Sequence, residues 1–121
     1  MGPVWDFETA FGNAGKTSYT GFVIKNVNWY TRLFQDPFFV AKVKERFDYF
    51  YNNQEDILNS INENAQYLKY AIKEDDTKWD TFQSYRYSNT DTWLLYQGHV
   101  SSMKSWLTKR MNWLKERYDA M

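Results

Sequence analysis

Two carboxylates near the start of the chain are its strongest candidates for chemistry. Asp6 and Glu8 are separated by a single residue, Phe7. Where the backbone is extended, alternate side chains point the same way, so both carboxylates would face one side. Carboxylate oxygens are hard ligands of the kind that Mg²⁺ prefers. The pair is therefore a candidate metal site, although the spacing alone favours a structural loop in which Asp6 accepts backbone N–H bonds.

Other residues that could do chemistry lack the partners that a site needs. His99 is the single histidine, and no second histidine or glutamate stands at metal-ligand spacing from it, which favours a structural or exposed role. No Gly-x-Ser-x-Gly nucleophile elbow is present. The Gly12–Thr17 segment is similar to the end of a phosphate-binding P-loop, but Ala10 stands where that loop requires glycine. The absence of cysteine excludes disulfides, thiol catalysis and cysteine-ligated zinc.

Charge and hydropathy exclude two further classes of function. The chain has 121 residues, and its 15 Lys and Arg balance its 15 Asp and Glu. A general nucleic-acid binder or a polybasic membrane-surface protein would carry a basic excess. No stretch approaches the roughly 20 apolar residues of a membrane-spanning helix, and Met1–Asp6 lack the basic and apolar regions of a secretory signal. We expect neither nucleic acid nor a membrane span.

Glycine and proline divide the chain into an arm and a helical part. Four of the five glycines and one of the two prolines lie in the first 21 residues. Residues 1–27 therefore read as an irregular arm that carries the Trp-Asp-x-Glu segment, with a short extended piece at Phe22–Ile24. Residues 28–121 read as a helical subdomain.

Apolar spacing predicts the helices that must position these candidates. A short helix is expected from Asn28 to Phe34, and a second begins after Asp36 as N-cap with Pro37 in its first turn and ends near Tyr51. The third helix follows Asn53 as cap and Glu55 and Asp56 in its first turn. Its apolar face falls at spacings of four and three: Ile57, Ile61, Ala65, Leu68 and Ile72.

The same reasoning covers the C-terminal third of the chain. The acidic run 74–76 is expected to end the third helix as a solvated turn, because negative charge at a helix C-terminus opposes the macrodipole. One or two helical turns are expected within 77–86, and the capping-box spacing of 88–91 then opens a helix from 91 to about 117. The predicted fold class is mainly α, a cluster of about four to five helices with a long C-terminal helix and an irregular N-terminal arm.

Arginine and aromatic residues inside these helices have structural interpretations. Arg110 falls on the apolar seam of the last helix, so its stem should pack while its head reaches a carboxylate or the rim; a buried ion pair is the alternative. Arg46, between Val43 and Phe47, has the same interpretation. Aromatic residues make up 21% of the chain. At helical spacing they are expected mainly in the core, and stacking on sugars or bases is the alternative.

Three separated segments resemble the spore-coat protein H (CotH) kinase family. The first is Gly2–Glu8 with Ala10–Asn13, similar to the family's Trp-Asp-x-Asp…Phe-Gly segment. The others follow in the family's order along nearly the whole chain. They are the Leu-x-x-Asp-Pro-x-Phe and Lys-x-Arg-aromatic patterns within 29–39 and 43–47, and the closing helix with Met103–Leu107, Arg110, Trp113 and Leu114.

That resemblance implies the C-terminal portion of an atypical protein kinase that phosphorylates Ser or Thr on coat or secreted proteins. It implies ATP and Mg²⁺ as cofactors of the parent protein, with Asp6 and Glu8 as metal ligands, although Glu8 stands where the family has a second Asp. It further implies that the nucleotide-gripping lobe and catalytic loop lie upstream in the parent chain. The expected partners are that upstream part and the parent's protein substrate. The expected location is exported, at the cell surface or in the spore coat.

Without the upstream parts, this chain alone is not expected to be an enzyme or to need a cofactor, because phosphoryl transfer depends on positioning and charge neutralisation by several groups. The alternative function is a non-catalytic helical module that binds protein or glycan through its aromatic face. Such a module would show no response to Mg²⁺ that depends on Asp6 and Glu8.

Overall fold

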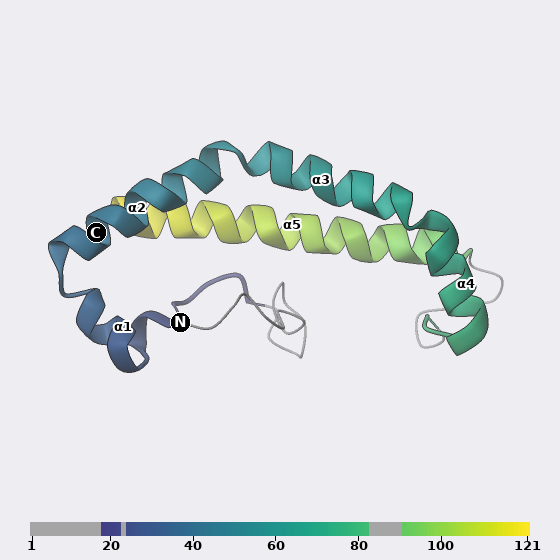
Figure 1. Cartoon of the computed structure of the whole chain (residues 1–121), viewed down its shortest axis with the longest axis horizontal. Coiled ribbons are helices and arrows are strands. Elements are labelled where there is room, and N and C mark those ends of the chain that lie inside the picture. Colours follow the sequence, from purple (N-terminus) through teal and green to yellow (C-terminus); the bar gives the residue numbers. More distant parts are fainter. Residues whose placement is uncertain (1–17, 23, 83–90) are drawn as a thin grey trace. The chain divides into compact units, whose positions relative to one another are not determined.

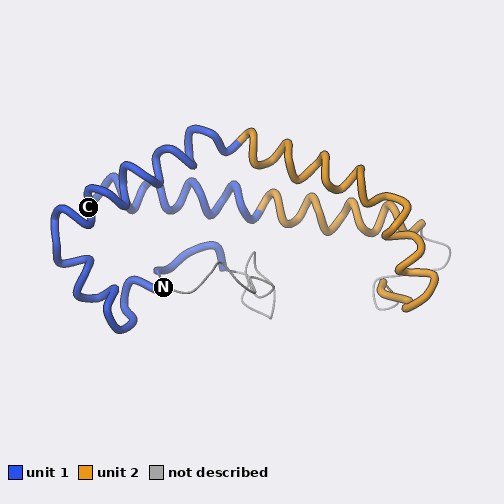
Figure 2. Tube along the Cα trace, in the orientation of Figure 1, with its two compact units in different colours: residues 1–54, 106–121 blue, residues 55–105 orange. Residues whose placement is uncertain are grey.

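The computed structural model describes residues 18–22, 24–82 and 91–121. The regular elements of these residues are all helical, as the sequence predicts, and the last is by far the longest (Figure 1). The chain divides into two compact units (Figure 2). Unit 1 comprises residues 1–54 and 106–121, and unit 2 comprises residues 55–105.

Unit 1 contains a short 3-10 helix, two α-helices and the end of a third. Their bounds are Ile24–Asn26 for η1, Asn28–Leu33 for α1 and Pro37–Asn52 for α2, and the final part of α5, Thr92–Asp119, completes the unit. Unit 2 contains α3, Gln54–Tyr67, then α4, Lys69–Trp79, and the first part of α5. Only the first residue of α3, Gln54, is assigned to unit 1.

The start of α2 follows the local chemistry that the sequence indicates. A carboxylate oxygen of Asp36 accepts the backbone N–H of Phe38 at 2.9 Å, which satisfies one of the unpaired donors of the first turn. Pro37 occupies the first helical position, where its fixed φ suits a helix and its missing N–H costs nothing. Asn53 caps the end of α2, and its side-chain amide donates to the carbonyl of Tyr49 at 2.7 Å.

Within unit 1, α2 lies antiparallel to the end of α5. The Tyr51 hydroxyl donates to Asn112 at 3.2 Å. One turn away, Lys115 lies 3.1 Å from Asp48, and the rings of Phe47 and Tyr118 have centroids 4.9 Å apart. As the residue number falls along α2 it rises along α5, which fixes both the direction and the register of this pair.

Within unit 2, α3 lies antiparallel to the first part of α5 (Figure 1). The Lys104 ammonium donates to Asn62 at 2.7 Å across the pair. Ala65 is buried, and Ile57, Ile61 and Ile72 are half-buried, in agreement with the predicted apolar face. Leu68, the remaining member of that face, is exposed.

The expected single helix from 54 to about 73 is wrong in two respects. It is two helices, α3 and α4, because Leu68 has φ −81° and ψ −2° and so turns the chain while its backbone bonds to Asn64 and Ile72 persist. The acidic run 74–76 does not end it: α4 continues to Trp79. The change of ψ at one residue, Leu68, does not alter the spacing of apolar residues, so the sequence could not show the break. The helix continues through the acidic run because the hydrogen bonds of Asp76, described below, outweigh the unfavourable interaction of its charge with the helix dipole.

Three other expected elements differ in detail. Ile24 begins a 3-10 helix, so it is not part of an extended piece. Residues 77–79 belong to α4, which ends at Asp80 in the left-handed conformation, φ 50°. The remainder of the turn expected within 83–86 and most of the capping box at 88–90 lie outside the described residues. Asp91, the last residue of that capping box, accepts the N–H groups of Trp93 and Leu94 at 3.0 and 3.3 Å and so caps α5.

Among the described residues the core is thin. The buried apolar side chains are Ala65, Phe82 and Met111, and no large side chain is fully buried. The seam of α5, by contrast, is half-buried from Trp93 to Leu114, as its spacing predicts. None of the described helices is both long and apolar enough to cross a bilayer.

Candidate functional site

The proposed metal ligands Asp6 and Glu8 lie outside the described residues, as does the glycine-rich stretch 12–17. Among the residues that the structure does describe, no three or more His, Asp or Glu side chains gather as a metal site would require. The chemistry that the described part of the chain offers is instead basic and aromatic, and it is concentrated in unit 1.

Arg110 binds the segment that precedes α1. Its Nη1 donates to the carbonyl oxygens of Tyr19 and Gly21 at 2.9 and 2.7 Å. The guanidinium also lies 5.0 Å from the centre of the Trp113 ring, a cation–π distance. The stem packs as the sequence indicates, but the acceptors of Arg110 among the described residues are backbone carbonyls. Neither the expected carboxylate nor the alternative ion pair is found in this part of the chain. Burial without a carboxylate lowers the pKa of Arg110.

Arg110 and Lys25 lie at a pocket of about 380 Å³ in unit 1. The rest of its wall is aromatic or aliphatic and includes Phe22, Tyr30, Phe34, Phe39, Leu114 and Tyr118. Phe22 packs against Trp113 and Tyr118 with ring centroids 5.0 and 5.5 Å apart. Burial raises the pKa of the Tyr118 hydroxyl, and the positive charge of Arg110 opposes that rise.

Lys25 is held by rings and a sulfur atom. Its Nζ lies 5.2 Å from the centre of the Phe22 ring and 5.5 Å from that of Phe34. The same Nζ is 4.0 Å from the sulfur of Met121, a weak acceptor.

Lys115 in the same unit has a different environment. Its Nζ lies 2.6 Å from Asp119 and 3.1 Å from Asp48. The hydrogen bonds that it donates, first to Asp119 and then to Asp48, raise its pKa. Three half-buried bases of unit 1 therefore differ in their partners: Lys115 is paired with acids, whereas Lys25 and Arg110 contact rings, a sulfur atom or carbonyls.

Asp76 in unit 2 is buried, with 5% of its surface exposed. It accepts the backbone N–H of Phe82 at 3.1 Å and the hydroxyl of Thr92. The expectation of a solvated turn at this residue is therefore wrong. An acidic run in a sequence cannot show which of its members turns inward, because the donors come from residues six and sixteen positions away.

The remaining candidates are surface residues. His99 is exposed and stacks on Phe82 with ring centroids 5.6 Å apart, in keeping with a structural or exposed role. Arg46 is exposed, and its guanidinium carbon lies 5.2 Å from the centre of the Tyr49 ring and 5.9 Å from that of Phe50.

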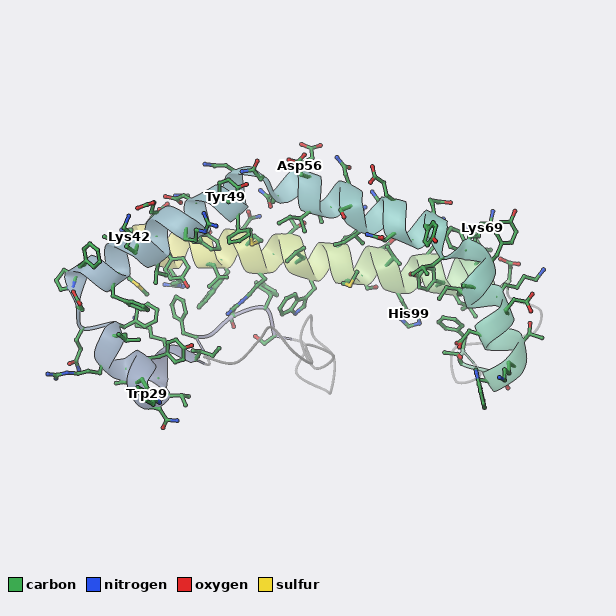
Figure 3. The ribbon with its side chains drawn as sticks, viewed as in Figure 1. Trp29, Lys42, Tyr49, Asp56, Lys69 and His99 are labelled. Atoms are coloured by element: carbon green, nitrogen blue, oxygen red, sulfur yellow. The ribbon has the colours of Figure 1, made fainter. Side chains whose placement is uncertain are left out.

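Exposed aromatic side chains occur on several helices. Trp29 of α1 is 80% exposed and projects away from its helix (Figure 3). The other aromatic residues of the described ranges that are more than half exposed are Phe38, Tyr49, Tyr67, Tyr70 and Trp79. The expectation that aromatic residues serve mainly as core therefore fails for this set, although it holds for the α5 seam.

The pocket is the feature that sequence reasoning missed. Its wall comes from the segment before α1, from α1, from α2 and from the end of α5. The carbonyls that fix Arg110 belong to Tyr19 and Gly21 and leave no side-chain signal. The one usable signal is Arg110 itself, a cation on an apolar seam.

Comparison with known proteins supplies the family. The model of the family described as CotH kinase protein matches residues 1–114. That range includes Asp6, Glu8 and the whole pocket wall except Tyr118. No curated protein and no solved structure gives a significant match. Because the matched range covers nearly all of the 121 residues, the chain belongs to the CotH kinase protein family.

Proposed function

We propose that this chain is the C-terminal helical subdomain of a CotH-like atypical Ser/Thr protein kinase. The observation that carries the proposal is the family match over residues 1–114, which joins the Trp-Asp-x-Glu segment to the helices. The helices would buttress the catalytic core, and their partners would be the upstream part of the parent chain and its protein substrate. The family also favours an exported, cell-surface or spore-coat location.

Asp6 and Glu8 would contribute a Mg²⁺-binding carboxylate pair to the parent. Carboxylate oxygens fit a hard divalent cation, and in kinases such a cation bridges and neutralises the nucleotide phosphates. Glu8 is one methylene longer than the Asp of the family pattern, so it would reach the cation with a different side-chain conformation. Alone, this chain is expected to have no turnover, because the pair does not supply the other positioning groups of phosphoryl transfer.

Metal binding is the first test. Mn²⁺ replaces Mg²⁺ at oxygen sites, and the paramagnetic relaxation that it induces can be read on the isolated chain. Asp6→Asn and Glu8→Gln should each weaken binding, whereas Asp56→Asn should not. Asp56 is a suitable control because it is an exposed carboxylate in the first turn of α3 (Figure 3). Equal binding by all three variants would show that the pair is not the metal site.

The size of the natural polypeptide is the second test. An immunoblot of source-cell fractions should show a band several-fold larger than 14.7 kDa, in the exported or surface fraction. A band at the size of this chain would contradict the proposed role as part of a larger kinase.

The exposed aromatic residues favour one alternative, a non-catalytic module that binds protein or glycan. Trp29, Tyr67 and Tyr70 are each at least 80% exposed, which suits stacking against a sugar ring or a partner side chain. A part cut from a larger enzyme would also expose such residues. The Mn²⁺ experiment separates the two functions, since a binding module has no need of a metal response at Asp6.

A further inference from the structure

The pocket of unit 1 combines an apolar wall with two basic side chains. Phe34 and Leu114 belong to its wall, and Lys25 and Arg110 line it as well. Its volume of about 380 Å³ falls in the range of small-molecule sites, roughly 300–1,000 Å³. Such sites bury the body of a ligand against apolar groups and orient it with a few polar ones.

Neither base has a carboxylate partner among the described residues. The contacts of Lys25 are two aromatic rings and the Met121 sulfur. The contacts of Arg110 are two backbone carbonyls and the ring of Trp113. Both bonds of Arg110 leave from Nη1, so its Nε and Nη2 donors remain available to an anion.

Lys115, another base of unit 1, differs from Lys25 and Arg110 because it is paired with acids. It is also half-buried, and it binds both Asp48 and Asp119. A buried or half-buried cation is ordinarily paired, because taking the charge from water is unfavourable without compensation. The pocket therefore holds positive charge that the described chain does not neutralise, although the protein as a whole has as many acids as bases.

We propose that this pocket binds a small organic anion, an apolar ring or short chain that bears a phosphate or carboxylate. The apolar body lies against Phe34 and Leu114, and the anionic head binds Lys25 and the Nε and Nη2 donors of Arg110. Guanidinium groups bind these anions with two parallel hydrogen bonds. The residues that line this pocket lie between 22 and 118, so the proposed metal pair is not among them.

Isothermal titration of the full chain with phenyl phosphate tests the proposal. Benzyl alcohol retains a ring without the charge, and inorganic phosphate retains the charge without a ring. Phenyl phosphate should bind about tenfold more tightly than either, because only it uses both parts of the pocket. No binding of phenyl phosphate, or equal binding of benzyl alcohol or inorganic phosphate, would overturn the proposal.

Two substitutions locate the binding. Lys25→Gln and Arg110→Gln should each weaken phenyl phosphate binding about tenfold or more, whereas Lys78→Gln should leave it unchanged. Lys78 lies on α4 in unit 2 and does not line the pocket, so Lys78→Gln makes the same change of charge at a residue outside the proposed site. Should Arg110→Gln lose helical circular dichroism, Lys25→Gln decides, because the hydrogen bonds to the carbonyls of Tyr19 and Gly21 come from Arg110 and stay in place in that variant. A Lys25→Gln variant that binds as tightly as Lys78→Gln would overturn the proposal.

Discussion

The hydroxyl of Thr92, in the first turn of α5, donates a hydrogen bond to the buried carboxylate of Asp76 in α4. The same carboxylate accepts the backbone N–H of Phe82, which is itself buried. Asp76 thus ties the end of α4 and the residues after it to the start of α5 within unit 2. Its neighbour Asp75 makes only an exposed bond, accepting the Thr81 hydroxyl at 2.7 Å.

Removing the Asp76 carboxylate should destabilise the protein more than removing its neighbour. Asp76→Ala leaves the buried N–H of Phe82 and the half-buried hydroxyl of Thr92 without this acceptor, and the free energy of unfolding should fall by about 1–3 kcal/mol. Asp75→Ala should lower it by less than about 1 kcal/mol. Urea unfolding followed by circular dichroism measures both, and equal losses would mean that Asp76 has no special structural role.

Two glycines should respond in opposite directions to alanine. Gly21 has φ +95°, which side chains rarely adopt, so Gly21→Ala should cost about 1–2 kcal/mol. Gly98 lies within α5, and a methyl group there meets nothing within 4 Å. Gly98→Ala should therefore raise the free energy of unfolding by about 0.5–1 kcal/mol. Thermal unfolding of the two variants gives the sign directly, and a shift of the same sign in both would contradict the backbone description.

The N-cap of α2 can be tested with a pair of variants. Asp36→Ala removes the acceptor of the Phe38 N–H and should lower the free energy of unfolding by about 1 kcal/mol. Asp36→Asn keeps an acceptor oxygen, so its free energy of unfolding should stay close to that of the wild type. Urea titration distinguishes them, and an Asn variant as unstable as the Ala variant would show that charge, not capping, is responsible.

Stability should decline in alkali because of two groups in unit 1. Burial raises the pKa of Tyr118, and hydrogen bonds to Asp119 and then Asp48 raise that of Lys115. A raised folded pKa means that the folded state keeps a proton which the unfolded state releases above pH 10.0 for Tyr and 10.5 for Lys. This stability is complete below the unfolded pKa and is lost as the pH rises through the folded pKa.

The Tyr118→Phe variant isolates one of these groups. Its ring can still contact Phe22 and Phe47, so the fold should be retained at neutral pH. The decline of unfolding free energy as the pH rises above 10.0, the unfolded pKa of Tyr, should become shallower than in the wild type. An equally steep decline would show that Tyr118 does not contribute to it.

Local patterns determined the parts of the fold that sequence reasoning predicted. The Asp36–Pro37 start signal and the half-buried seam of α5 depend on residues a few positions apart, and the structure confirms both. The bend at Leu68 and the inward turn of Asp76 depend on contacts with distant segments, and both were missed.

The candidate site divides in the same way. Arg110 stood out as a base on an apolar seam, but its carbonyl partners come from residues 91 and 89 positions earlier. Every residue has a backbone carbonyl, so residue types do not show which carbonyls will bind Arg110. The pocket that these contacts help to form could therefore not be predicted from the sequence. Asp6 and Glu8 lie within the range that the family model matches, and their metal binding remains a prediction.

Phosphoryl transfer by the intact parent protein tests the central claim most directly. The assay would follow transfer from ATP to protein Ser or Thr in the presence of Mg²⁺, with wild type, Asp6→Asn and the control Asp56→Asn. We expect Asp6→Asn to reduce turnover about a hundredfold or more, because a metal ligand is lost, and Asp56→Asn to leave it unchanged. Full activity of Asp6→Asn, or no Mg²⁺-dependent transfer by the wild-type parent, would contradict the proposed function.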